Sequence, residues 1–205
     1  MKLNNKLQEF VSGLKYQDIS DERKDILQVL IDQIQSSVNA GDKVNLNFIC
    51  THNSRRSHLS QVWAQTMAAY FDIPEVYCYS GGTEATAIYP QVIETLTMSG
   101  FQIRQLSTGT NPVYAIKFAD NLPAIIGFSK KHDDTFNPKS DIVAIMTCAH
   151  ADENCPFIPA AKQRIPIRYE DPKKFDETPL KAKMYEERSR QISVEMSYIF
   201  SSIKL

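Results

Sequence analysis

The stretch that decides the fold is VNLNFICTHNSRRSHLSQVWAQTMAAYF, residues 44–71. Residues 44–49 form a short apolar run that predicts a β-strand, and residues 57–71 carry apolar side chains at helical spacing. Between the two lies an eight-residue loop that begins at Cys50 and ends at Ser57. A strand that leads through a loop into a helix is the unit of an α/β fold. The side chains that we expect to face inward from the helix are Leu59, Val62, Trp63, Thr66 and Met67.

The rest of the chain extends this unit. Apolar runs predict further strands at residues 76–79, 141–147 and 164–169, and helical patterns occupy residues 89–99 and 180–203. Because helices separate the strands, we expect a parallel sheet with right-handed crossovers. Residues 105–138 contain prolines and lysines without a clean period, so their structure stays unassigned.

Two amphipathic helices are expected in the first 40 residues. The second has Ser20 as a plausible N-cap, acidic residues in its first turn, and a turn at residues 39–42 after it. We therefore divide the chain into an N-terminal helical extension, residues 1–41, and a catalytic domain, residues 42–205. The apolar residues that recur along the second helix are Ile26, Leu27, Leu30, Ile31 and Ile34.

Bulk composition excludes several classes of function. A formal net charge of −1 over 205 residues gives no reason to expect a nucleic acid or membrane partner. The polar N-terminus lacks the apolar core of a signal peptide, and no apolar run approaches the length of a membrane span. We expect a cytoplasmic protein whose four cysteines (50, 78, 148 and 155) are reduced at rest, without the spacing of a zinc site.

The loop at residues 50–57 carries residues suited to anion chemistry. A loop that enters a helix N-terminus turns backbone N–H groups into one concavity with positive potential. Such a place favours the thiolate of Cys50, to which Ser57 can donate a hydrogen bond. Arg56 offers a planar fork for two anion oxygens, and Asn53 suits a left-handed backbone position. The predicted oxyanion-binding residues are Thr51, His52, Asn53, Ser54, Arg55, Arg56 and Ser57.

The stretch FICTHNSRRS, residues 48–57, resembles the signature loop of the low-molecular-weight protein tyrosine phosphatase superfamily, which includes the thioredoxin-coupled arsenate reductases. The resemblance runs from about residue 44 to the C-terminus, with an interruption at residues 105–138, and leaves residues 1–40 uncovered. It implies an α/β fold with a four-stranded parallel sheet and helices on both faces. The chain departs from the family at His52, where a small residue is usual, and at Arg55, where a second cysteine is frequent. Arg55 either adds positive charge to the pocket or points to solvent.

Two cysteines follow the predicted strand at residues 141–147. Because ligands bind at the carboxyl ends of parallel strands, Cys148 should lie near Cys50. On spacing alone, Cys148 and Cys155 are either a thiol relay or one core cysteine and one incidental surface cysteine. The segment Cys148-x6-Cys155-Pro156 is similar to the redox segment of the arsenate reductases, which ordinary phosphatases of this superfamily lack. The resemblance therefore implies the relay.

The dipeptide Asp171-Pro172 follows the last predicted strand. Such a dipeptide also marks ordinary turns, but in this superfamily its aspartate is the general acid, which implies that Asp171 protonates the leaving oxygen. Some arsenate reductases bind potassium near the loop, where a glutamate is expected at the position of Gln61. We predict no metal and no cofactor.

Three functions compete. The leading hypothesis is an arsenate reductase in which Cys50 attacks the oxyanion, Asp171 assists, and Cys148 and Cys155 carry the electrons, with thioredoxin as donor. The alternative is a protein tyrosine phosphatase with a phosphocysteine intermediate on Cys50. A third reading, a non-catalytic oxyanion-binding module, conflicts with the presence of Cys50, Arg56 and Asp171.

Overall fold

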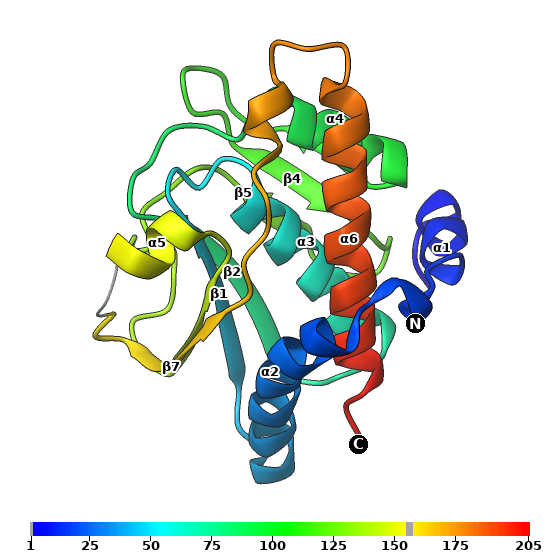
Figure 1. The fold of residues 1–205 in the computed structure, drawn as a ribbon, viewed down its shortest axis with the longest axis vertical. Coiled ribbons are helices and arrows are strands. Elements are labelled where there is room, and N and C mark those ends of the chain that lie inside the picture. The colour runs from blue at the N-terminus through cyan, green and yellow to red at the C-terminus, as the bar shows by residue number, and fades with distance from the viewer. Residues whose placement is uncertain (1, 155–157) are drawn as a thin grey trace.

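A four-stranded parallel sheet forms the centre of the protein (Figure 1). The computed structural model describes residues 2–154 and 158–205. The strand order is β2-β1-β6-β7, which confirms the predicted α/β fold. The strands are β1 (Val44–Cys50), β2 (Val76–Gly82), β6 (Ile142–Met146) and β7 (Ala161–Pro166). The last strand begins three residues before the predicted range of 164–169.

Side chains alternate between two faces along the central strands, and each face is buried under helices. Phe48 and Ile145 belong to a large apolar core, whereas Ile49 and Met146 belong to a small separate cluster. In Figure 1, helices α2, α3 and α6 lie on one side of the sheet and α5 lies on the other. The helices outside the N-terminal region are α3 (Arg56–Tyr70), α4 (Pro90–Ser99), α5 (Ala149–Asn154) and α6 (Lys181–Ser201), with a short 3-10 turn η2 (Pro172–Phe175). Among the described residues, no helix has the length and apolar character to cross a lipid bilayer.

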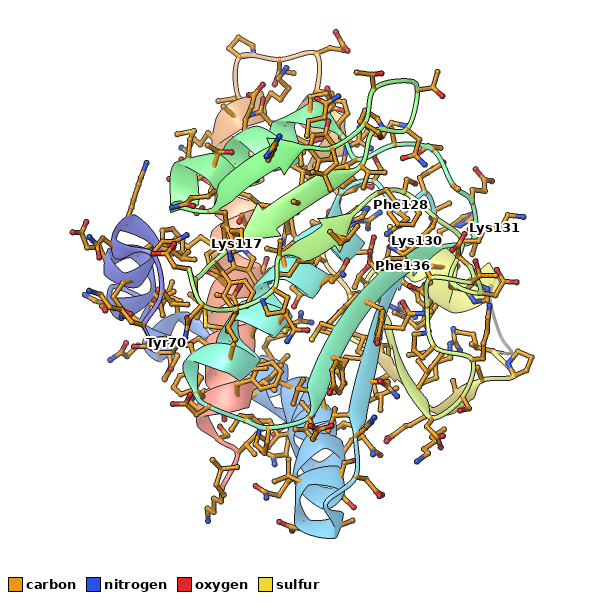
Figure 2. All side chains as sticks on the ribbon, turned by 180° about the vertical axis from the view of Figure 1, so that it is seen from behind. Tyr70, Lys117, Phe128, Lys130, Lys131 and Phe136 are labelled. Carbon is orange, nitrogen blue, oxygen red and sulfur yellow. The ribbon has the colours of Figure 1, made fainter. Side chains whose placement is uncertain are left out.

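A second, antiparallel sheet lies at residues 102–127, mostly within the stretch 105–138 that the sequence left unassigned. Its strands are β3 (Gln102–Gln105), β4 (Tyr114–Lys117) and β5 (Ile125–Gly127), in the order β3-β4-β5. Figure 2 views the molecule from this side, with Lys117 on β4 and Phe128 just after β5. Strands of three or four residues are too short to show a period-two pattern, which explains why the sequence analysis missed them.

The N-terminal region forms α1 (Asn5–Ser12), a 3-10 turn η1 (Tyr16–Asp18) and α2 (Asp21–Ala40). Ser20 caps α2 as predicted, because its Oγ accepts a hydrogen bond from the Arg23 N–H at 3.2 Å. Gly41 ends the helix in a left-handed conformation. The buried side chains of α1 and α2 join the same core as the sheet. The two predicted parts of the chain therefore share one core, and their division at residue 41 stays a prediction.

One member of the predicted apolar stripe of α2 does not lie in the core. Ile26 is 41% exposed, whereas Leu27, Leu30, Ile31 and Ile34 are buried. Successive side chains of a helix turn by about 100°. Ile26 therefore lies about 90° from the centre of the stripe and faces outward.

Candidate active site

The loop between β1 and α3 is held by its carbonyl oxygens. The carbonyls of residues 50, 51, 52 and 54 accept hydrogen bonds from outside the loop, donated by Thr83 N (3.2 Å), Glu84 N (2.8 Å), Ser129 Oγ (2.9 Å) and Tyr89 N (3.1 Å) respectively. In a planar trans peptide, the N–H points away from the C=O. The N–H groups of residues 51, 52, 53 and 55 are therefore turned towards the inside of the loop, where they can bind an anion.

Asn53 shapes the loop from behind. Its φ of 44° is in the left-handed region that the sequence analysis expected for it. Its side-chain amide donates to Ser57 Oγ at 2.8 Å and accepts from the Lys130 N–H at 2.9 Å. Gly82, at the end of β2, allows the loop backbone at Thr51 to approach closely, because a Cβ on residue 82 would lie 2.6 Å from the Thr51 carbonyl oxygen.

Cys50 and Ser57 face each other across the loop. The distance from Cys50 Sγ to Ser57 Oγ is 3.1 Å, and both residues are buried. Because Ser57 Oγ already accepts from Asn53, its own O–H is free to donate to the sulfur. A hydroxyl in this position can donate to the sulfur while the sulfur acts as a nucleophile.

Arg56 lines the same hollow as Cys50, and two of its guanidinium nitrogens have hydrogen-bond acceptors whereas a third has none among the described residues. It donates from NH1 to the Tyr169 carbonyl at 3.0 Å and from NH2 to Asp171 Oδ2 at 2.5 Å. Its Nε is buried and finds no acceptor among the described residues. A buried donor without an acceptor is costly, so this N–H is suited to an oxygen of a bound oxyanion.

Six of the predicted residues line one narrow hollow: Cys50, His52, Ser54, Arg55, Arg56 and Asp171. Within this hollow, Arg56, the predicted anion-binding residue, forms an ion pair with Asp171, the predicted general acid. An incoming oxyanion would compete with the Asp171 carboxylate for the guanidinium of Arg56, which places Asp171 where a general acid for a leaving oxygen is needed.

Arg55 lines the hollow and does not point to solvent, which was the other position that the sequence left open. Its side chain is only 12% exposed, and it donates to Tyr185 Oη at 2.5 Å and to Asp176 Oδ2 at 2.6 Å. Its guanidinium also lies 4.2 Å from the centre of the Tyr89 ring. Burial, with help from Asp176, raises the pKa of the Tyr185 hydroxyl. Sequence reasoning missed this aromatic and acidic surrounding, because its members lie far apart in the chain.

Cys148 lies at the carboxyl end of β6, in the same small apolar cluster as Cys50. Its Sγ is 3.6 Å from Thr51 Oγ1 and accepts from the Ala151 N–H at 3.3 Å. The same Thr51 hydroxyl is 3.3 Å from His150 Nδ1, a partner that the sequence analysis did not find. Cys155, the second predicted relay thiol, lies outside the described residues.

Two buried polar side chains meet between β2 and α3. Ser80 Oγ on β2 is 3.4 Å from His58 Nδ1 on α3, so this serine contacts the helix that follows the loop. Lys130 is buried beside the rings of Phe128 and Phe136, and its Nζ lies 4.5 and 5.3 Å from their centres (Figure 2). Burial lowers the pKa of Lys130 to about 8. Burial, and then the charge of Lys130, lower the pKa of His58 to about 3.

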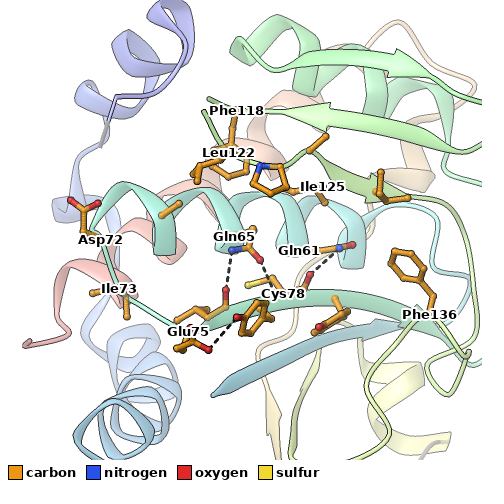
Figure 3. Close-up of a pocket in the computed structure, with 17 residues that line it drawn as sticks. Gln61, Gln65, Asp72, Ile73, Glu75, Cys78, Phe118, Leu122, Ile125 and Phe136 are labelled. Carbon is orange, nitrogen blue, oxygen red and sulfur yellow. Dashed lines mark hydrogen bonds between the residues drawn. The ribbon is translucent and has the colours of Figure 1, made fainter. Parts of the chain in front are cut away.

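A cavity of about 580 Å³ lies apart from this chemistry, along the free edge of β2 (Figure 3). Gln61 and Gln65 reach from α3 to the backbone of that edge: each side-chain amide donates, to the carbonyls of Cys78 (3.0 Å) and Val76 (3.1 Å), and Gln65 also accepts from Cys78 N–H (2.9 Å). Cys78 is buried as expected for a core cysteine, and burial raises the pKa of its thiol. This cavity therefore contains no candidate nucleophile in its thiolate form.

No protein-family model matches the chain. In sequence it is similar to arsenate reductase 2 of Staphylococcus epidermidis, with 28% identity over 131 residues that cover 64% of this chain and 80% of that protein.

Solved structures share the fold. A YwlE mutant from Bacillus subtilis superposes with a TM-score of 0.53 and 11% identity, over 78% of this chain and 97% of the other. A low-molecular-weight protein tyrosine phosphatase from T. tengcongensis gives 0.52 and 13%, over 78% and 100%. The predicted resemblance is thus confirmed: the chain has the fold of the low-molecular-weight protein tyrosine phosphatases and is related in sequence to arsenate reductases.

Proposed function

We propose that this enzyme is an arsenate reductase that uses Cys50 as its nucleophile. The observation that carries the proposal is the hollow that Cys50 and Arg56 line together: the Cys50 sulfur lies 3.1 Å from Ser57 Oγ, and the buried Arg56 Nε–H has no acceptor among the described residues. The sequence similarity to arsenate reductases supports arsenate as the oxyanion.

The first step forms a sulfur–arsenic bond. The Cys50 thiolate attacks arsenic, Asp171 gives a proton to a leaving oxygen, and water departs. Arg56 and the inward N–H groups of residues 51, 52, 53 and 55 hold the remaining oxygens, whose negative charge they neutralise. A phosphate ester can undergo the same first step, with an alcohol as the leaving group.

The second step separates a reductase from a phosphatase. The Cys148 thiolate attacks Cys50 Sγ, and the electron pair of the sulfur–arsenic bond stays on arsenic, which is reduced from As(V) to As(III) and leaves as arsenite. Cys155 then attacks Cys148 Sγ, frees Cys50, and leaves a Cys148–Cys155 disulfide. The short link from Cys148 through Thr51 to the loop supports this relay, because a phosphatase has no use for a thiol there.

The electron donor and the compartment follow from this chemistry. We propose thioredoxin as the donor, on the similarity of the segment at residues 148–156 to that of thioredoxin-coupled reductases. A dithiol relay that starts reduced requires a reducing compartment, so we propose a cytoplasmic location.

The test is a side-by-side assay of purified protein for arsenate turnover and aryl phosphate hydrolysis. We expect arsenate turnover that depends on added thioredoxin and its reductase, and no turnover of either substrate by Cys50→Ser, because an alcohol is not ionised at neutral pH. Robust aryl phosphate hydrolysis without any arsenate turnover would replace this proposal with a phosphatase.

A further inference from the structure

We propose that His150 accepts the proton of the Cys148 thiol through the hydroxyl of Thr51. The inference rests on the proposed function, because it concerns the second step of the reductase reaction. It assigns a role to a histidine that the loop chemistry does not use.

Three atoms form a continuous hydrogen-bond chain. Thr51 Oγ1 lies 3.6 Å from Cys148 Sγ and 3.3 Å from His150 Nδ1. A threonine hydroxyl donates one hydrogen bond and accepts others. In the thiol state, the S–H of Cys148 donates to Oγ1 and the O–H of Thr51 donates to Nδ1 of a neutral histidine. After the transfer the donors and acceptors are exchanged: the O–H of Thr51 donates to the Cys148 sulfur, and the Nδ1–H of His150 donates to Oγ1. Each of the two contacts therefore has one hydrogen before and after the step.

The surroundings of Cys148 make such a chain necessary. The residue is only 2% exposed, so bulk water has little access to its proton. His150 is exposed and can pass a proton on to solvent. Once formed, the thiolate is favoured by the Ala151 N–H, which points at Sγ from 3.3 Å. The pKa of Arg168 is raised mainly by its hydrogen bond with Asp152 and in small part by Cys148, so a positive charge is within electrostatic reach of the sulfur.

The step balances without a further reagent. The proton moves from Cys148 Sγ to Thr51 Oγ1 while the Thr51 hydroxyl proton moves to His150 Nδ1. The sulfur lone pair then forms the Cys50–Cys148 disulfide bond, and the pair of the broken sulfur–arsenic bond reduces arsenic. His150 carries the extra proton as imidazolium until it is lost to water.

A pH profile can separate a histidine from the other groups around the chain. Carboxylates and guanidinium groups in general keep their charges between about pH 5.5 and 8, whereas histidine side chains lose their proton in that range. On the described parts of the elements around the chain, the other charged or titratable side chains are Asp152 and Glu153 on α5, Lys162 and Arg164 on β7, Arg168 after it, and Cys50, His52, Arg55 and Arg56 in the loop. The imidazole of His52 lies 3.5 Å from the Glu84 carboxylate, and His52 remains present in every variant below.

Two pairs of variants test the chain. His150→Asn removes the proton acceptor, with His150→Gln as a second neutral replacement. Thr51→Val removes the hydroxyl at nearly constant shape, and Thr51→Ser restores it. For each protein we would measure arsenite release in a single turnover, aryl phosphate hydrolysis as an internal reference that does not involve Cys148, and the rate at which iodoacetamide alkylates Cys148, read by peptide mass spectrometry.

We expect the ratio of arsenite release to aryl phosphate hydrolysis to fall about tenfold or more in His150→Asn and Thr51→Val, and to recover in Thr51→Ser. In the wild type, Cys148 alkylation should slow as the solution becomes more acidic, because protonated histidine accepts no proton. In His150→Asn and Thr51→Val the alkylation rate should be lower and its dependence on pH should differ from that of the wild type, because the thiol has lost its route to a base.

Equal Cys148 alkylation rates and pH profiles in wild type, His150→Asn and Thr51→Val would overturn the inference. The alkylation readout does not need arsenate. If the wild type releases no arsenite, the proposed function fails, while the alkylation profile still decides whether His150 and Cys148 are coupled.

Discussion

Arg23 on α2 connects the N-terminal helices to the candidate site through a buried carboxylate. Glu195, with a side chain only 3% exposed, accepts from Arg23 Nε at 3.0 Å and from Arg23 NH2 at 2.8 Å. It also accepts from Tyr169 Oη at 2.8 Å, and the carbonyl of Tyr169 holds Arg56. Replacement of Arg23 with methionine should therefore destabilise the protein and loosen Arg56.

The magnitude follows from what Glu195 retains. In Arg23→Met the carboxylate keeps only neutral donors, Tyr169 Oη and Gln191 Nε2, and loses its counter-charge. Removal of one partner of a buried ion pair costs about 3–5 kcal/mol. Because the Arg23 side chain is 17% exposed, we expect the lower end, roughly 3 kcal/mol. At about 2–4 °C per kcal/mol, the melting temperature should fall by roughly 6–12 °C.

Urea denaturation and thermal unfolding of Arg23→Met would measure this loss, with the double variant Arg23→Met/Glu195→Gln as the matched control. The neutral amide removes the unpaired charge, so the double variant should regain more than half of the lost stability. A loss below about 1 kcal/mol in Arg23→Met would refute the view that α2 supports the site through this pair.

Three further predictions concern the loop and its support. Arg56→Lys should lower kcat/KM for either substrate by about a hundredfold or more, since a point charge cannot replace the planar fork; near-normal kinetics would show that the guanidinium does not clamp the anion. Gly82→Ala should abolish activity and lower the melting temperature, because its Cβ would lie 2.3 Å from the Glu84 carbonyl oxygen; an active, stable variant would show that the turn can move away. For Lys130, the native pKa of about 8 lies below its unfolded value, so the unfolded chain binds the extra proton and stability rises with pH. Between pH 8 and 10 the free energy of unfolding of wild type should rise by roughly 2–3 kcal/mol relative to Lys130→Met, and equal pH profiles in urea denaturation would count against a buried ammonium.

Local pattern was enough to predict the parts of the site that are contiguous in sequence. The strand ending at Cys50, the loop and the helix after it are encoded by neighbouring residues, and so is the left-handed position of Asn53. The placement of Cys148 followed from the rule that parallel strands end at one edge. These predictions needed no knowledge of distant contacts.

The contacts that the sequence did not reveal join residues far apart in the chain. Arg55 contacts Asp176 and Tyr185, and Thr51 contacts His150. The partners in each contact are more than ninety residues apart in the sequence. No periodicity reports such pairs, because either partner alone looks like an ordinary surface residue. The three short strands of the second sheet were missed for the related reason that pairing partners, not local pattern, define them.

The most direct test of the reductase account is the amount of arsenite released by Cys148→Ser, Cys155→Ser and the core control Cys78→Ser, with thioredoxin present. We predict sustained release by the wild type and Cys78→Ser, about one arsenite per molecule from Cys155→Ser, and none from Cys148→Ser, because two thiols must supply the two electrons. All four proteins should hydrolyse a small aryl phosphate. Sustained release by Cys148→Ser, or no arsenite from the wild type while aryl phosphate hydrolysis is strong, would contradict the account.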